Sequence, residues 1–226
     1  MATKKIDKQA LQKEKIEETV SKTEQFYNEN KKTIWTCILA VAVIALGLVA
    51  YHQFYFKPKT AEAQEQTYPA EAAFRNGDFE VALNGDGNNL GFIDLIDEYG
   101  TKAGKAVYYY AGICELQLKD YEQAVKYLKK YKGKEPIMAA RAIASLGDAY
   151  AGLEQYEEAV AQYEKAAGMS DNVFAAEYLL KAAVAYEELG NKDKALKLYE
   201  TIKDKYPQSI EGYDVDKYIN RIKFAE

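Results

Sequence analysis

A pattern of small and large residues recurs about every 35 residues between positions 104 and 207, and it constrains this chain more than any other feature. In each recurrence an alanine is followed four positions later by a large residue. The matched positions are Tyr121, Ala124 and Leu128; Tyr156, Ala159 and Tyr163; and Lys192, Ala195 and Tyr199. A small residue precedes each alanine by twelve positions, at Gly112, Gly147 and Ala183. Self-similarity with this period is typical of arrays of helix pairs.

The small residues have a physical role in such an array. Two antiparallel helices approach closely only where their facing side chains are small, and larger residues then fill the remaining gaps. The predicted gap-filling residues are Leu146, Tyr150, Tyr163 and Tyr199. One helix pair cannot bury its apolar face alone, whereas stacked neighbours can. No stretch alternates with a period of two, so strands are not predicted. The expected fold class is therefore all-α, a solenoid of antiparallel helix pairs.

This pattern resembles the tetratricopeptide repeat family over residues 104–207, which would hold three units. The second unit carries the resemblance most completely, at Leu146, Gly147, Tyr150, Tyr156, Ala159, Tyr163 and Ala166. Glu115 in the first unit and Lys192 in the third depart from the family pattern. The resemblance implies a tetratricopeptide-repeat solenoid of three units.

The segments that flank the three units also show helical features. Residues 57–103 are expected to hold a linker and a degenerate first repeat, because Gly77, Phe79 and Ala82 mimic its turn and second helix. Residues 84–89 form an insertion in this repeat, and a helix is expected to resume over residues 90–99. Residues 208–226 are predicted to cap the last repeat with a helix over residues 214–224.

An uncharged segment at residues 34–56 predicts a transmembrane helix that precedes the solenoid. Its length is sufficient to cross a hydrocarbon core of about 30 Å. Lysines bracket the segment and aromatic residues stand at both ends, as at membrane interfaces. Pro58 is predicted to end this helix. A cleaved signal peptide is the alternative, but a 33-residue polar lead and Leu48 at the outer small position before Ala50 argue against it.

Residues 1–33 form a charged segment with a thin apolar stripe. The stripe consists of Ile6, Ala10, Ile16, Val20, Thr23 and Tyr27. It predicts either an amphipathic helix that docks on a partner or a membrane surface, or a solvated tail. Lysines are more numerous before the apolar segment than after it, which favours a cytoplasmic N-terminus and a C-terminal domain outside the cytoplasm.

Composition argues against several classes of function. The net charge of −5 gives no electrostatic support for nucleic-acid binding. His52 is the single histidine, so neither Cys37 nor Cys114 has a ready activating base, and no enzyme activity, metal or cofactor is expected. The stretch from Asn84 to Asn89 invites a calcium interpretation, but it lacks the glycine and glutamate of an EF-hand loop. A polar turn is therefore expected there.

The tetratricopeptide resemblance implies that partners bind on a concave face made by the first helix of each unit. The positions implied are Ala106, Tyr109 and Ile113; Arg141, Ala144 and Asp148; and Glu177, Leu180 and Val184. The Lys/Asn clamp for the acidic tails of heat-shock chaperones is absent, since Tyr109 and Ile113 occupy its key places. A groove for apolar or aromatic anchors is expected, with Arg141 as a single charge contact. Alternatively, the protein's own upstream helices fill part of this surface.

The order of segments resembles the YfgM family, ancillary subunits of the bacterial Sec translocon. Phe26, Tyr27, Glu29 and Asn30 match the family's pattern just before the membrane. The resemblance implies an inner-membrane protein with a periplasmic repeat domain. Its implied partners are the translocon, a membrane-bound prolyl-isomerase-like chaperone and exported clients. The insertion at residues 84–89 departs from the family pattern. A scaffold for cell-wall or outer-membrane assembly is the alternative function.

Overall fold

The computed structural model describes the backbone of residues 3–169 and 173–224, and the side chains of residues 24–169 and 174–224. Every regular element within this part is a helix, which confirms the all-α prediction. The chain divides into two compact units, residues 1–58 and 59–226, which are described separately.

The first unit is helical, with α1 spanning Thr3–Tyr51 and a π-helical turn, η1, spanning His52–Phe56. Side chains of the apolar segment are exposed; Ile44 and Leu48, for example, are 62% and 65% exposed. Among the described residues, one helix is long and apolar enough to cross a membrane, by length and composition. Trp35 donates a hydrogen bond from Nε1 to the Tyr27 hydroxyl over 3.3 Å. Of the predicted stripe from Ile6 to Tyr27, only Tyr27 lies within the described side chains, and it is 40% exposed.

Pro58 does not end the helix, contrary to the prediction. The backbone N–H of Lys57 donates to the carbonyl of His52, five residues back, as in a π-helix. Helix α2 begins at Lys57 and continues to Asn76, so the segment expected to be a linker is helical. Pro58 follows directly after the π-helical turn, and its ring nitrogen has no N–H to donate. The sequence signal for a helix end was therefore overridden by a change of hydrogen-bond register.

The degenerate repeat is an upstream hairpin in which α2 packs against α3 (Phe79–Asn84) and α4 (Phe92–Tyr99). Its core combines buried aliphatic residues such as Ala82 and Leu95 with aromatic rings. The Phe74 ring lies 5.0 to 6.2 Å from the rings of Phe79, Phe92 and Tyr110. Between α3 and α4 the insertion forms a polar turn, as expected. Its Asp86 carboxylate accepts hydrogen bonds from the backbone N–H groups of Asn88 and Asn89. A 3₁₀ turn, η2 (Gly100–Ala103), leads to the repeats.

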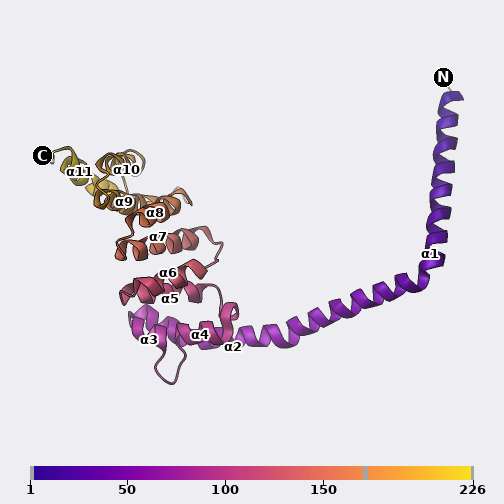
Figure 1. Ribbon diagram of the computed structural model, residues 1–226, viewed down its shortest axis with the longest axis horizontal. Coiled ribbons are helices and arrows are strands. Elements are labelled where there is room, and N and C mark those ends of the chain that lie inside the picture. The colour runs from indigo at the N-terminus through magenta and orange to yellow at the C-terminus, as the bar shows by residue number, and fades with distance from the viewer. Residues whose placement is uncertain (1–2, 170–172, 225–226) are drawn as a thin grey trace. The chain divides into compact units, whose positions relative to one another are not determined.

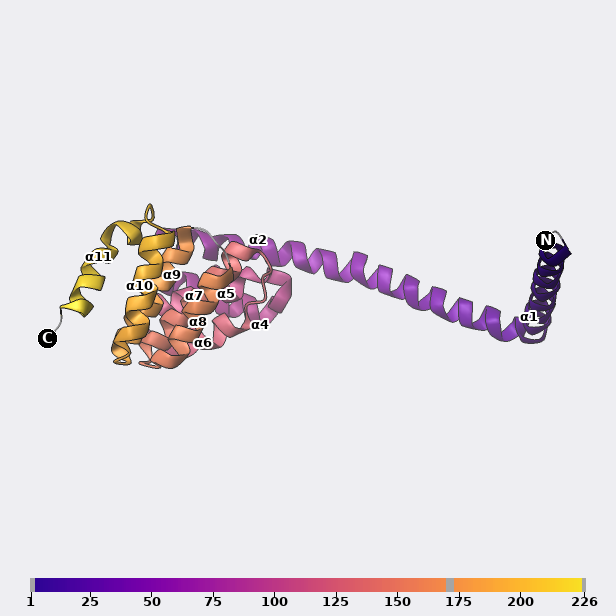
Figure 2. The ribbon, with the colours of Figure 1, turned by 90° about the horizontal axis from the view of Figure 1, so that it is seen from above.

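Three helix pairs follow, and Figure 1 shows them stacked in chain order. The pairs are α5 (Ala106–Gln117) with α6 (Tyr121–Lys130), α7 (Pro136–Gly152) with α8 (Tyr156–Met169), and α9 (Val173–Glu188) with α10 (Lys192–Lys205). Seen from above, in Figure 2, the first helices form one layer and the second helices the other. The stack therefore has a first-helix face, formed by α5, α7 and α9.

The small residues lie at the closest approaches, as the pattern predicts. A Cβ added to Gly112 would stand 2.6 Å from Cγ of Leu128, and one added to Gly147 would stand 2.6 Å from Cε1 of Tyr163. Ala183 is fully buried at the equivalent place in the third pair. The large residue at the end of each recurrence therefore fills the space that glycine or alanine leaves open.

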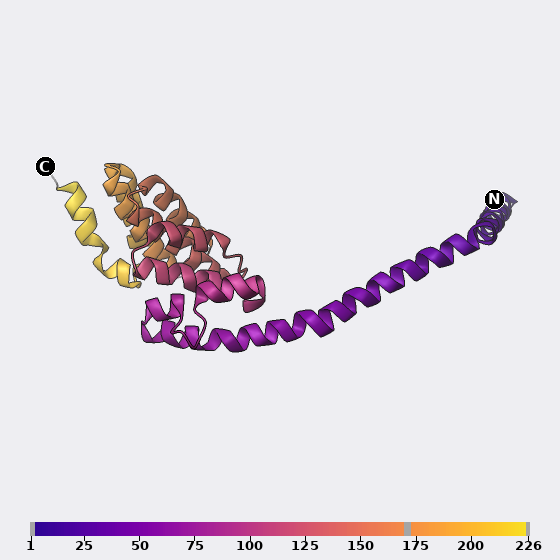
Figure 3. The same ribbon diagram turned by 60° about the horizontal axis from the view of Figure 1, so that its bottom comes forward.

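Helix α11 (Ile210–Lys223) ends the described chain and lies beside α10 in Figure 3. It begins four residues before the predicted start, because the Ser209 hydroxyl accepts a hydrogen bond from the backbone N–H of Gly212 and caps the helix. Val215 and Ile219 are buried against the third pair. On the outside, the Arg221 guanidinium donates to Glu187 of α9 over 2.6 Å. Helix α11 thereby covers the apolar side of the last repeat.

Candidate functional site on the first-helix face

The nine residues predicted for the concave face lie on α5, α7 and α9 at spacings of three and four, which places them on one side of each helix. Arg141 and Val184 are exposed, whereas Ala106, Tyr109, Ile113, Asp148, Glu177 and Leu180 are half-buried. Ala144 is the exception, since it is only 3% exposed and packs in the core between the helices. Its methyl group is covered by neighbouring side chains, so it presents little surface to a partner.

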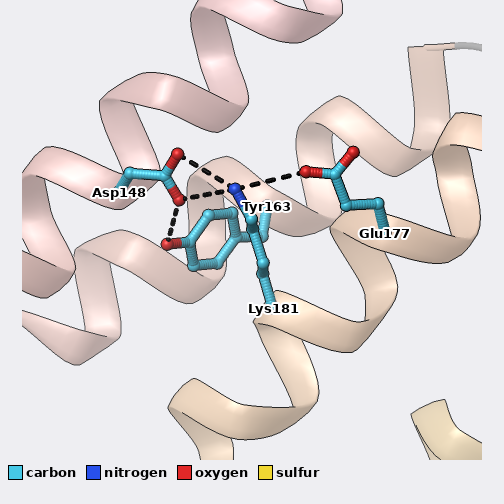
Figure 4. Close-up of polar contacts among 4 residues, drawn as sticks. All are labelled: Asp148, Tyr163, Glu177 and Lys181. Atoms are coloured by element: carbon cyan, nitrogen blue, oxygen red, sulfur yellow. Dashed lines mark hydrogen bonds and ion pairs between the residues drawn. The ribbon is translucent and has the colours of Figure 1, made fainter. Parts of the chain in front are cut away.

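A charged network joins three helices on this face (Figure 4). The Lys181 ammonium of α9 lies 3.0 Å from both carboxylate oxygens of Asp148 on α7. It also lies 3.4 Å from Glu177, one turn earlier on α9. The hydroxyl of Tyr163, on α8, donates to Asp148 over 2.9 Å. Two predicted residues, Asp148 and Glu177, are therefore held by side chains that the sequence analysis did not select.

Electrostatics keep Lys181 of this network charged at neutral pH. Burial opposes the charged form of Lys181, but Asp148 and Glu177 outweigh that effect and raise the pKa of the ammonium. Burial also raises the pKa of Tyr163, and the Asp148 carboxylate adds to the effect. One sequence signal could have identified Lys181, since it follows Glu177 at the i,i+4 spacing of a helical ion pair. No sequence spacing links it to Asp148, 33 residues away.

An apolar pocket of about 200 Å³ adjoins the network. Ala151 of α7 and two tyrosines of α8, Tyr156 and Tyr163, contribute to its walls. The remaining walls come from α9, and they are formed by Leu180, Lys181, Val184, Ala185 and Glu188. Two predicted residues, Leu180 and Val184, therefore line a real concavity. Tyr156 and Ala151 were missed because the family pattern assigns the binding face to a narrower set of positions.

The remainder of the face is aromatic and carries one separate cation. The ring of Tyr109 lies 5.7 Å from that of Tyr110 and 5.9 Å from that of Tyr131. Burial raises the pKa of Tyr109, and the nearby Arg141 opposes that shift. The Arg141 guanidinium lies 6.0 Å from the centre of the Phe174 ring, in a cation–π contact. A second hollow of about 310 Å³ lies where α9 meets the first turn of α11.

Among the described residues, no group of three or more histidines, cysteines, aspartates and glutamates could hold a metal ion. Cys114 is fully buried, and burial raises the pKa of its thiol to about 12. The thiolate needed for nucleophilic chemistry is therefore scarce at neutral pH. The geometry of the first-helix face suits the binding of another polypeptide: a pocket of side-chain size, a charged rim and aromatic surface.

Comparisons with known proteins agree with this architecture. The tetratricopeptide repeat family matches residues 106–136 and residues 145–210, which include most of the three helix pairs. These two segments of the chain therefore match tetratricopeptide repeats, a kind of repeat that binds protein partners. A comparison with curated protein sequences gave no match.

Among solved structures, MamA from Desulfovibrio magneticus RS-1, residues 41 to the end, is 19% identical with a TM-score of 0.52. The alignment covers 63% of this chain and 74% of that one. The ArsTM double mutant of MamA RS-1 is 18% identical with a TM-score of 0.53, and the alignment covers 86% of this chain and 94% of that one. At these identities the similarity concerns the fold alone.

Proposed function

We propose that this protein is a single-pass membrane scaffold or co-chaperone whose first-helix face binds partner polypeptides beside the bacterial Sec translocon. The apolar pocket between α7, α8 and α9 is the observation that carries this proposal. It lies on the face that the family uses for binding, and two of the residues selected for that role line it. Binding through a repeat surface requires no catalytic group.

The proposed anchor is the uncharged helix at residues 34–56. Its large apolar side chains are exposed, and a hydrocarbon environment would cover them. Trp35 near one end and the aromatic run from Tyr51 to Phe56 at the other suit the two membrane interfaces. The lysine excess before the helix supports an N-terminus in the cytoplasm and a repeat domain in the periplasm.

The proposed partners follow from the resemblance to YfgM. They are the Sec translocon, a membrane-bound prolyl-isomerase-like chaperone and newly exported proteins. The match of Phe26, Tyr27, Glu29 and Asn30 before the membrane supports this choice. The side chain of Asn30 donates to the backbone carbonyl of Phe26 over 3.0 Å, so the motif lies on the helical surface ahead of the anchor.

Photo-crosslinking in native membranes tests the proposed partners. A photoreactive residue at position 184 on the first-helix face should capture translocon or chaperone components and exported proteins. The same residue at position 81 is a matched control, because Val81 is 43% exposed and Val184 is 39% exposed. Capture of cell-wall or outer-membrane assembly proteins instead would favour the alternative scaffold. Capture at position 81 alone would remove the first-helix face from the function.

Cysteine labelling tests the orientation. Ile210 is 83% exposed, so Ile210→Cys provides a reactive thiol, whereas Ser209 is only 5% exposed and is unsuitable. We expect a membrane-impermeant reagent to label the variant from the periplasmic side. Cys114 is fully buried and contributes little background. Labelling from the cytoplasmic side alone would reverse the proposed topology.

A further inference from the structure

The pocket between α7, α8 and α9 has the size and walls of a site for one side chain. Its volume of about 200 Å³ is below the range of about 300–1,000 Å³ that is usual for sites of cofactors and other small molecules. Ala151, Leu180 and Val184 give it aliphatic walls, and the Tyr156 ring closes another side. A leucine, methionine or phenylalanine side chain from another chain matches this space and this chemistry.

Carboxylates outnumber amines around this pocket. The Lys181 ammonium at its wall already contacts both Asp148 and Glu177. A third carboxylate, that of Glu188, lines the pocket itself. Three carboxylates therefore face one ammonium, which leaves two negative charges in excess. The pocket is an apolar hollow in negatively charged surroundings.

Lys181 is not available to attract an acidic partner. Its ammonium lies 3.0 Å from both oxygens of Asp148 and 3.4 Å from Glu177, which together use its three donors. Arg141, the other cation on this face, lies over the Phe174 ring instead. The hollow next to Phe174 adds Glu211 beside Glu177, so the acidic character continues along the face. An incoming cation would therefore be favoured and an incoming carboxylate repelled.

We propose that this pocket binds a large apolar side chain of a partner polypeptide that carries lysine or arginine on both sides of it. The proposal rests on the proposed function, because it names the chemistry of the segment that the first-helix face binds. Glu177 and Glu188 are eleven residues apart on α9, or about 16 Å along the helix axis. An extended segment spans that distance in about five residues. The basic residues would thus stand two or three positions before and after the apolar one.

Binding of fluorescent peptides to the full chain in uncharged detergent tests this specificity. The first peptide has a central phenylalanine with a lysine two positions away on each side, in a serine background. In the second peptide glutamates replace the lysines, and in the third alanine replaces the phenylalanine. We expect the lysine peptide to bind about tenfold more tightly than the glutamate peptide at low salt, with most of that difference lost at about 1 M salt.

The alanine peptide should also bind about tenfold more weakly, because it buries little apolar surface. Equal or tighter binding of the glutamate peptide, or no binding of the lysine peptide, would overturn the proposal. If partners are still captured in membranes, either result leaves the proposed function intact. Conversely, peptide discrimination without capture of translocon or chaperone components would contradict the proposed function and support the specificity of the pocket.

Two pairs of variants locate the site. Val184→Gln should weaken binding of the lysine peptide about fivefold, whereas Val81→Gln at a similarly exposed position should leave it unchanged. Glu188→Lys should abolish the tighter binding of the lysine peptide relative to the glutamate peptide. Glu65→Lys, at an exposed position of α2, should retain it. Equal effects within either pair would overturn the assignment to this pocket. Far-UV circular dichroism verifies that each variant is folded. If a variant unfolds, the comparison of the three peptides on the unmodified protein still tests the proposed specificity.

Discussion

The upstream hairpin and the second repeat solve the same packing problem in different ways. In the hairpin, aromatic side chains join the aliphatic core: Phe74 contacts Phe79 and Phe92 of the hairpin and Tyr110 of the neighbouring α5. In the second repeat, Gly147 leaves a space on α7 that the ring of Tyr163 from α8 fills. The hairpin also accommodates a turn that splits its second helix into α3 and α4, whereas α8 is continuous.

The difference shows what a repeat signature requires. A glycine facing a large residue sets the distance between two helices closely, so the pattern is readable in sequence. An aromatic cluster fills an irregular space by tilting its rings, so many sequences could do the same. The hairpin therefore completes the stack with part of the signature: it keeps the buried Ala70 and Ala82, but Asp86 stands where the repeats place a large residue. The predictions below test the two kinds of packing, from the largest expected effect to the smallest.

The aromatic core should be the most sensitive part of the hairpin. Phe92 is fully buried between Phe74 and Tyr110. We expect Phe92→Ala to lower the free energy of unfolding by about 3–5 kcal/mol, through lost burial and a cavity. Urea unfolding of the full chain, followed by far-UV circular dichroism, measures this change. Phe224→Ala is the control, because Phe224 is 79% exposed. Similar values for both variants would contradict the account of an aromatic core.

Overpacking tests the second repeat. Gly147→Ala adds a Cβ that would stand 2.6 Å from Tyr163, so the ring must shift. We expect a loss of about 1–3 kcal/mol in the free energy of unfolding. Gly168→Ala is the matched control on α8, since a Cβ there meets no atom within 4 Å. It should instead stabilise the protein by about 0.5–1 kcal/mol, the usual gain over glycine inside a helix. The same sign in both variants would refute the close approach at Gly147.

The contribution of the Tyr163 hydroxyl to the stability of the second repeat should depend on pH above about 10. The pKa of Tyr163 is raised in the folded state, so its stabilising contribution is fully present below the unfolded value of about 10 and is lost as pH rises through the folded value. Tyr163→Phe should cost about 1–2 kcal/mol at pH 8, from the lost hydrogen bond to Asp148. Above pH 10 the difference between the two proteins should shrink. A constant difference from pH 8 to pH 12 would exclude titration of Tyr163 as its cause.

The first repeat departs from the family pattern at one buried position, where Glu115 stands in place of an aromatic residue. This carboxyl is only 6% exposed, and burial, with the nearby Asp120, raises its pKa. Because the folded pKa lies above the unfolded one, stability is lost as pH rises from the unfolded value through the folded value, and the charged form is the costly one at neutral pH. Glu115→Gln should therefore stabilise the protein at pH 7 by about 0.5–1 kcal/mol, an ordinary size for one substitution. The gain should vanish near pH 4, and a loss at pH 7 would contradict this view.

The sequence predicted most of the stack because its constraints are local and repeated. Gly112, Gly147 and Ala183 mark the close approaches between paired helices. The continuation of the helix past Pro58 could not be predicted in the same way. It depends on the π-helical turn η1, which no spacing of residues in the sequence predicts. The buried state of Ala144 likewise depends on neighbours from other helices.

The candidate site likewise has features that the sequence predicted and features that only the tertiary structure shows. The sequence by itself determined that α5, α7 and α9 present one face, because residues at spacings of three and four on a helix share a side. It also determined the uncharged helix, which needs only composition and length. Only the tertiary structure decided that Lys181 meets Asp148 and that Tyr156 joins Leu180 and Val184 around a pocket. Such contacts join helices whose relative position is set by the packing of the whole stack, and no local pattern records that position.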